Sequence, residues 1–405
     1  MTSNIQRIPL IDTIRGIALF GILVFNIQTY ALFTFLTPEH VYMLQLDKPD
    51  SYAPLQFIFH TLVNGQFYTI YSFLFGLGFY MMKEKNDQLG LNSNKLFKHR
   101  LWILLIFGLI HGLIFWFGDI LHKYAILGFT LLYFNKKSIK TLFKWIAGLM
   151  IFSVVLKITT TILMQDSNAP NPQEIDPIIK EVMNTWQHGS FMEVVSLQKL
   201  GVAMLWFISI INGLSAATSI LIMFIVGLIA GKINFFNRIP ELKGKLLKFL
   251  SIFLPISLLL KAFSALDIFN LQIFSNVPPI IRDLVFSVTN FISVPVLAVC
   301  YLIVLSLALH KNSSTFFKWI ANAGKLGLTN YLMQTIICMF LFYGYGFGLS
   351  GKLTLFETFL CVIPIYIFQL IFSSIWIKYY KTGPVETLWR RLSGMSKESK
   401  KTKSI

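Results

Sequence analysis

The chain has 405 residues, of which 55% are hydrophobic and only 13% are charged, and this composition excludes an ordinary soluble globular domain. Its 35 Lys and Arg residues exceed its 18 Asp and Glu residues and give a net charge of +17. Such an excess would suggest nucleic-acid binding in a soluble protein. No basic patch here carries the interleaved aromatic residues that stack on bases, so we expect no nucleic-acid partner.

Apolar runs long enough to cross a bilayer recur along the whole chain. A hydrocarbon layer of about 30 Å needs about 20 apolar residues per helix. Read against Gly, Pro and charged breaks, the runs predict ten spans, within a range of nine to twelve, at 10–34, 54–82, 101–117, 119–135, 142–164, 201–231, 248–265, 283–309, 326–348 and 353–377. The predicted fold is an all-α polytopic transmembrane helical bundle.

Two of the ten runs, 54–82 and 201–231, approach 30 residues. Each contains an Asn-Gly pair, Asn64-Gly65 in the first and Asn212-Gly213 in the second. Because Asn-Gly favours turns, these spans are expected to be tilted, broken at that pair or split in two.

The charges of the connecting loops alternate along the chain. The connections after the second, fourth, sixth and eighth predicted spans are rich in Lys and Arg, whereas the intervening ones are acidic or nearly neutral. Lys and Arg accumulate in cytoplasmic loops, so this alternation predicts that both termini lie in the cytoplasm. The basic segment from Lys378 onward agrees with that orientation.

We expect one transmembrane domain over 1–392, with an N-terminal part at 1–165 and a C-terminal part at about 201–392. The outer loop 166–200 opens polar and Pro-rich and then becomes amphipathic, so it is expected to lie on the outer surface or to cap a cavity. The basic segment 393–405 has almost nothing apolar to bury and is expected to be a disordered cytoplasmic tail.

Several kinds of site are absent from the sequence. Its three cysteines, Cys300, Cys338 and Cys361, fall in apolar runs without CxxC spacing, which favours core positions over disulfides or metal ligands. No metal site is expected. No Walker, HExxH, GxSxG or dinucleotide motif appears, which argues against ATP hydrolysis.

Ionisable groups at membrane depth are costly unless they are paired or face water, so the polar residues of the first span are informative. At about 100° per residue, Asp12, Arg15 and Asn26 fall on one helix face. Asp12 and Arg15 can pair near the cytoplasmic end. This pair is either an anchor at the lipid phosphates or a grip on an anionic ligand, since guanidinium suits phosphate.

The next spans carry further polar groups. His60 and Asn64 share one face of the second span, either as hydrogen-bonding contacts between helices or as part of a site. His111 is expected past mid-depth in the third span, with Asp119 at the outer turn that follows. The two side chains are either structural or form a base and its orienting carboxylate. Asn26, His60, Asn64 and His111 are expected in one layer around a cavity.

The C-terminal part adds two groups of polar residues. Asn330 and Gln334 share a face of the ninth span and are expected to line the same cavity. Glu386, Arg390 and Arg391 follow the last span at the predicted cytoplasmic surface. Either arginine is expected to meet phosphate or to extend to the lipid headgroups.

Five stretches, in order from residue 7 to about 392, resemble the YeiB family of bacterial multi-pass membrane proteins. They are RIPLIDTIRGIALFGILVFNI, FYTIYSFLFGLGFYMM, RLWILLIFGLIHGLIFWFGDILHKYAILGF, GKLGLTNYLMQTI and TGPVETLWRRL. The resemblance implies a location in the bacterial plasma membrane, and the C-terminal region of the family is catalogued as a domain of unknown function. The family has been loosely described as involved in transport.

The start of the chain is also similar to that of the transmembrane acyltransferases, which include heparan-α-glucosaminide N-acetyltransferase. Asp12, Arg15, Gly16 and Asn26 match the shared LDxxRG-like start and the Asn that ends the first helix. That similarity implies acyl transfer from cytoplasmic acyl-CoA to an acceptor on the far side. The catalytic histidine of the acetyltransferase lies in the outer loop after the first helix, whereas His111 belongs to the YeiB pattern instead.

The leading hypothesis is therefore acyl transfer across the membrane. Arg15, with Asp12 beside it and Arg390 nearby, would hold the phosphates of acyl-CoA, a co-substrate rather than a permanently bound cofactor. His111, oriented by Asp119, would act as general base on an acceptor hydroxyl or amine. The remaining candidates are Asn26 or Asn64 at the oxyanion and four cavity residues, namely His60, Asn64, Asn330 and Gln334.

Two other hypotheses remain. The first is a transporter or flippase for a small or amphipathic solute, with His111 and Asp119 as a proton relay. The second is a structural membrane protein without chemistry. The expected partners are membrane lipids and a sugar, lipid or cell-envelope polymer as acceptor, and the sequence leaves homo-oligomer formation open.

Overall fold

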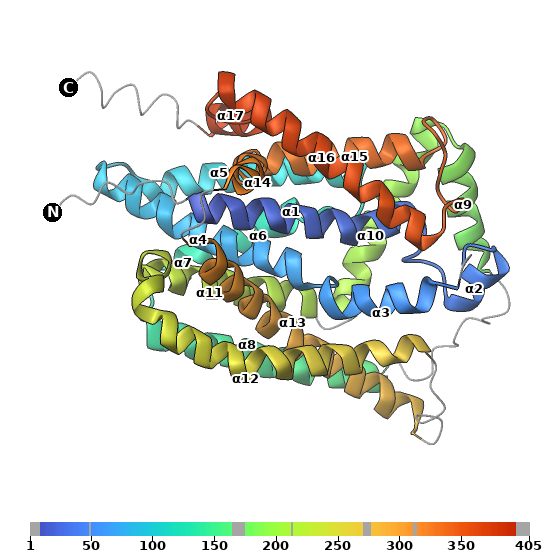
Figure 1. The fold of residues 1–405 in the computed structure, drawn as a ribbon, viewed down its shortest axis with the longest axis horizontal. Coiled ribbons are helices and arrows are strands. Elements are labelled where there is room, and N and C mark those ends of the chain that lie inside the picture. The colour runs from blue at the N-terminus through green and yellow to red at the C-terminus, as the bar shows by residue number, and fades with distance from the viewer. Residues whose placement is uncertain are drawn as a thin grey trace.

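The computed structural model describes residues 9–47, 50–163, 175–211, 214–269, 277–310 and 314–393. Within these ranges the regular secondary structure is helical and contains no strand (Figure 1). Most of the segment expected as a disordered tail, and the Pro-rich start of the expected outer loop, lie outside the described residues. The all-α class predicted from the apolar runs is confirmed.

The helices follow one another with short connections (Figure 1). In chain order they are α1 (Pro9–Tyr30), α2 (Pro38–Met43), α3 (Tyr52–Leu62), α4 (Gln66–Gln88), α5 (Ser93–Ile110), the π-helical turn η1 (His111–Phe115), α6 (Leu121–Gly128), α7 (Leu131–Phe134), α8 (Ile139–Leu163), α9 (Pro177–His188), α10 (Phe191–Ile211), α11 (Ser215–Lys232), the 3₁₀ turn η2 (Phe235–Arg238), α12 (Ile239–Ala265), the 3₁₀ turn η3 (Leu266–Phe269), α13 (Pro279–Leu309), α14 (Thr315–Lys325), α15 (Gly327–Phe342), α16 (Leu355–Tyr379) and α17 (Pro384–Leu392).

Eight helical segments of the described chain are long and apolar enough to cross a membrane. They are Pro9–Tyr30, Ser93–Phe115, Ile139–Leu163, Phe191–Ile210, Ser215–Lys232, Phe235–Ala265, Pro279–Leu309 and Leu355–Tyr379. A ninth span is possible by the same criteria if α14 and α15, which bend by 84° at their junction, count as one. The helices are thus those of a multi-pass membrane protein.

Three of the ten expected spans differ in the structure. The expected span 54–82 is two helices, broken at Gly65, whose φ of +99° lies in the left-handed region that glycine tolerates. The expected span 119–135 consists of α6 and α7, which are too short to cross a bilayer. The expected span 201–231 is divided between α10 and α11, on either side of 212–213.

Glycines let two central helix pairs pack closely. A Cβ on Gly76 of α4 would lie 2.1 Å from the carbonyl oxygen of Phe224 in α11. A Cβ on Gly324 of α14 would lie 1.9 Å from the carbonyl oxygen of Asp12 in α1. Small residues at such crossings let backbones touch, which is how helices associate in lipid. The second crossing fixes α14 against the polar start of α1.

The two ends of the bundle differ. Helices α2 and α9 lie at one end, whereas α17 lies at the end where α1 begins (Figure 1). Aromatic side chains fill the former end: the rings of Tyr30 and Trp116 stack at 3.8 Å, and Trp186 of α9 lies 5.1 Å from Tyr343. The α9 segment therefore caps the bundle there, and the cavity lies at the α17 end.

Candidate functional site

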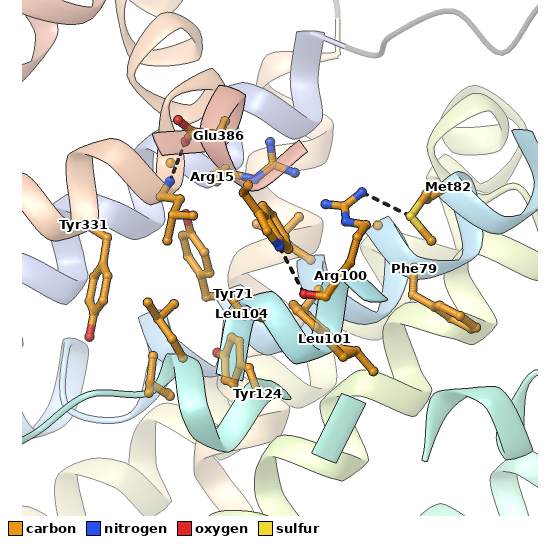
Figure 2. A pocket seen from close by; sticks show the side chains of 18 of the residues that line it. Arg15, Tyr71, Phe79, Met82, Arg100, Leu101, Leu104, Tyr124, Tyr331 and Glu386 are labelled. Carbon is orange, nitrogen blue, oxygen red and sulfur yellow. Dashed lines mark hydrogen bonds between the residues drawn. The ribbon is translucent and has the colours of Figure 1, made fainter. Parts of the chain in front are cut away.

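A cavity of about 300 Å³ opens between α1, α4, α5, α6, α14, α15 and α17 (Figure 2). These helices include those expected as the first, second, third and ninth spans. The walls are mainly apolar and aromatic; they comprise Ile22, Tyr71, Leu74, Phe75, Gly78, Phe79, Met82, Phe97, Leu101, Leu104, Ile120, Leu121, Tyr124, Gly324, Gly327, Leu328, Tyr331 and Trp389. A long apolar chain fits such walls.

Four cationic side chains also line the cavity, namely Arg15, Arg100, Lys325 and Arg390. Arg15 donates a hydrogen bond from Nη1 to Asp12 Oδ1 at 2.9 Å. The same nitrogen lies 3.4 Å from the carbonyl oxygen of Gly324, at the close crossing of α1 and α14. These contacts hold the guanidinium of Arg15 in place at the cavity.

Arg100 reaches the cavity from α5. Its guanidinium lies 4.2 Å from the ring centroid of Trp389 and 3.1 Å, through Nη1, from the sulfur of Met82 (Figure 2). Trp389 in turn donates from Nε1 to the carbonyl oxygen of Arg100 at 3.0 Å. A guanidinium stacked on an aromatic face retains N–H donors for an anion.

The carboxylate of Glu386 also lines the cavity, and it accepts hydrogen bonds from other groups of the protein. Its Oε1 accepts from the backbone N–H groups of Leu328 at 2.8 Å and Thr329 at 3.1 Å. These are N–H groups of the first turn of α15, where a negative charge is favourable. Four cations against one carboxylate leave an excess of positive charge in the lining, so the cavity favours an anionic ligand.

A second polar group, whose residues are not among those of the described chain that line the cavity, surrounds Asp119. His111 Nδ1 lies 2.8 Å from Asp119 Oδ1, and His122 Nδ1 lies 2.7 Å from Asp119 Oδ2. His111 Nε2 lies 2.9 Å from Thr335 Oγ1, on α15. All four side chains are buried. The structure thus brings His111 and Asp119 together.

Local backbone features assemble this group. His111 begins the π-helical turn η1, in which an extra residue per turn re-aims side chains and which is frequent at functional sites. One turn earlier, a Cβ on Gly108 would lie 2.3 Å from the backbone nitrogen of His122, so glycine lets α6 approach α5. Asp119 Oδ2 also accepts from that nitrogen at 3.0 Å.

The hydrogen bonds select the tautomers. An ionised carboxylate only accepts, so His111 and His122 each donate from Nδ1 to Asp119. In the neutral ring, Nε2 of His111 is then an acceptor, and Thr335 donates to it. Within the described residues, no group of three or more His, Cys, Asp or Glu side chains is arranged to hold a metal ion.

Tyr331 stands between the cluster and the cavity. Its side chain lines the cavity, as Figure 2 shows, and its ring lies 5.3 Å from that of His111. Ile120 and Leu121, which follow Asp119, line the cavity as well. Tyr331 thus connects the cavity, whose cationic mouth comprises Arg15, Arg100, Lys325 and Arg390, with the histidine cluster.

Other expected site residues lie elsewhere. Within the described chain, the residues that line the cavity include neither Asn26 nor the pair His60 and Asn64. Nδ1 of His60 and Nδ2 of Asn64 lie 3.0 Å apart, and α3 packs against α12 and α16. Asn26 is half-buried. These three residues and His111 thus do not line this cavity together, because depth leaves the direction of each side chain undetermined.

Asn330 and Gln334 connect helices and do not line the cavity in the described chain. Asn330 Nδ2 donates to the carbonyl oxygen of Ala323 and to Ser373 Oγ, both at 2.9 Å. Gln334 Nε2 donates to the carbonyl oxygen of Leu19 and to Gln369 Oε1. The two residues were expected to face the cavity from one side of the helix, but their side chains contact other helices, including α16 and α1.

Sequence reasoning missed several residues of the site. None of Arg100, His122, Lys325 and Thr335 was singled out from the sequence. A signal for His122 existed, because it lies three residues after Asp119, at the spacing that lets an aspartate accept from the first turn of a helix.

Comparisons with known proteins agree with the resemblance. Residues 230–396 match the family described as a protein of unknown function, DUF418. The chain is 30% identical over 420 residues to the uncharacterized protein YxaH of Bacillus subtilis (strain 168), covering 98% of this chain and 97% of that protein. It is 27% identical over 418 residues to the uncharacterized protein YeiB of Escherichia coli (strain K12), covering 96% of each. No solved structure matches it.

Proposed function

The chain belongs to the YeiB-like family of uncharacterised proteins, and we propose that it transfers an acyl group from cytoplasmic acyl-CoA to an acceptor at or beyond the bacterial plasma membrane. One observation carries this proposal. Tyr331 lines a cavity with a cationic mouth and apolar walls, and its ring lies 5.3 Å from that of His111, which is hydrogen-bonded to Asp119.

The mouth suits the phosphate groups of CoA. The alternating loop charges favour a cytoplasmic position for the start of α1 and for α17, which is where the cations lie. Arg15 and Arg100 present guanidinium groups, which bind phosphate in bidentate fashion. Arg390 and Lys325 add positive charge. The apolar walls suit the pantetheine arm and the acyl chain.

The histidine cluster suits base catalysis. Asp119 holds the imidazole of His111 in the tautomer whose Nε2 accepts a proton. A neutral imidazole so oriented is a general base for an acceptor hydroxyl or amine. The acceptor class that fits an envelope location is a sugar, a lipid or a cell-envelope polymer.

Purified protein incubated with radiolabelled acetyl-CoA tests this proposal. Wild type is expected to bind the compound and release free CoA, and His111→Ala is expected to bind it and release about 10²–10⁴-fold less. The matched control is His310→Ala, which lies after α13 and does not line the cavity of the described chain. Absence of binding and of CoA release by wild type would contradict the proposal.

The second candidate function is transport of a small or amphipathic solute by a buried proton relay. The observation that favours it is Nε2 of His122, which is buried and has no hydrogen-bond partner within the described chain. Such a nitrogen can accept a proton and pass it through Asp119 to His111. Uptake into proteoliposomes that depends on a pH gradient and disappears in Asp119→Asn would support transport, and uptake independent of the gradient would contradict it.

A further inference from the structure

Thr335 completes a hydroxyl–imidazole–carboxylate series. Thr335 Oγ1 lies 2.9 Å from His111 Nε2, and His111 Nδ1 lies 2.8 Å from Asp119 Oδ1. The same order of groups activates serine and threonine nucleophiles in enzymes of unrelated folds. Thr335 lies 224 positions along the chain from His111, so only the fold brings them together.

The series is held rigidly. The second oxygen of Asp119 accepts from both Nδ1 and the backbone nitrogen of His122, at 2.7 and 3.0 Å. Exposure of the four side chains lies between 1% and 4%. A mid-helix threonine commonly bonds back to a carbonyl one turn earlier. The hydroxyl of Thr335 is instead directed at His111, which is the orientation that proton transfer requires.

Thr335 is also placed to receive a group from the cavity. It lies four residues after Tyr331 on α15, hence on the same face one turn further from the cationic mouth. Tyr331 lines the cavity, and its ring contacts that of His111. A thioester that enters the cavity and displaces this ring meets His111 and Thr335 next.

From this geometry we propose that Thr335 Oγ1 is the nucleophile that first takes the acyl group, so that transfer proceeds through an acyl-threonine ester. This proposal rests on the acyl-transfer function proposed above. In this scheme Thr335 of α15 carries the acyl group between the two half-reactions. CoA can therefore leave before the acceptor reacts.

Nε2 of His111 takes the hydroxyl proton of Thr335, Oγ1 bonds to the carbonyl carbon of the thioester, and the carbon–sulfur bond breaks. The CoA thiolate leaves with the proton from His111 as a thiol. In the second half, His111 takes a proton from the acceptor hydroxyl or amine, which attacks the ester. Thr335 then leaves with the proton, and the enzyme is restored.

The test uses full-length protein in detergent with radiolabelled acetyl-CoA and no acceptor. Wild type is expected to release a burst of one CoA per chain and to keep one acetyl group after denaturation, mapped to Thr335 by peptide mass spectrometry. Thr335→Ser is expected to retain the label. Thr335→Val, which preserves shape, is expected to lose both burst and label, while Thr358→Val, at a buried threonine of α16, keeps them.

Each outcome separates the two proposals. CoA release and acceptor acylation that persist in Thr335→Val, or an acetyl group mapped to another residue, would overturn the role of Thr335 and leave acyl transfer standing. Wild type that binds no acetyl-CoA and releases no CoA would overturn both. Retained acetyl-CoA binding by Thr335→Val shows that this variant is folded, so its loss of label reports chemistry.

Discussion

The carboxylate of Glu386 accepts a hydrogen bond from the hydroxyl of Thr329, with 2.5 Å between Oε2 and Oγ1. This contact joins α17 to the first turn of α15, although 57 positions separate the two residues. It places Trp389 and Arg390, which follow Glu386 on α17, along the cavity. The mouth of the cavity therefore depends on a helix cap supplied by another helix.

Removal of that cap is expected to destabilise the protein. Glu386→Ala leaves two backbone N–H groups and one hydroxyl without their charged acceptor, which costs about 1–3 kcal/mol. Unfolding in a denaturing detergent measures this free energy. Glu241→Ala, which removes an exposed partner of Arg238, is the control, with an expected cost below about 1 kcal/mol. Equal stability of the two variants would contradict the capping role.

The crossing of α1 and α14 is expected to tolerate no side chain at Gly324. A Cβ there would lie 1.9 Å from the carbonyl oxygen of Asp12, so Gly324→Ala forces the helices apart and costs about 1–3 kcal/mol. Gly244→Ala is the control, because nothing lies within 4 Å of its Cβ and alanine favours the helix. If both variants unfolded at the temperature of wild type in a thermal melt, this close contact would be contradicted.

The sequence predicts those parts of this fold that depend on local pattern. Long apolar runs locate helices, and the Asn64-Gly65 pair correctly marks a break, because the φ of +99° at Gly65 is a local requirement. The amphipathic part of the expected outer loop is helical, as α9 and the start of α10. Apolar content alone predicted a membrane span at 119–135, where the structure has two short helices.

The site was predictable only where its partners are near in sequence. Asp12 pairs with Arg15 within one helix turn, and Asp119 follows His111 by eight residues. The contact of His111 with Thr335 depends on how α15 packs, which residue depth does not determine. For the same reason Gln334, although correctly placed on a polar face, bonds to Gln369 and not to a ligand.

The ring of Tyr331 is expected to restrict access to His111. Tyr331→Ala removes the ring that lies 5.3 Å from the imidazole and should raise the rate of His111 modification by diethyl pyrocarbonate by about tenfold, as read by peptide mapping. Tyr71→Ala is the control, since it enlarges the same cavity and leaves Tyr331 in place. The same rate in both variants would contradict a gate at Tyr331.

Asp119→Asn is expected to abolish turnover without unfolding the protein. An amide donates where the carboxylate accepted, so the imidazole of His111 turns to the tautomer with a proton on Nε2 and no longer accepts from Thr335. A loss of CoA release of about 10³–10⁴-fold follows. Asp283→Asn, on an exposed carboxylate, is expected to act as wild type. Full activity of Asp119→Asn would contradict the assigned tautomer.

The affinity of the purified protein for acetyl-CoA tests the central claim most directly. Wild type and Arg238→Gln, an exposed arginine outside the cavity, are expected to bind alike. Arg100→Gln is expected to bind about tenfold or more weakly, since loss of one charge-assisted hydrogen bond costs about 1.5–3 kcal/mol. The weakening should shrink at high salt. Equal affinity of Arg100→Gln and Arg238→Gln, or no saturable binding by wild type, would contradict the account.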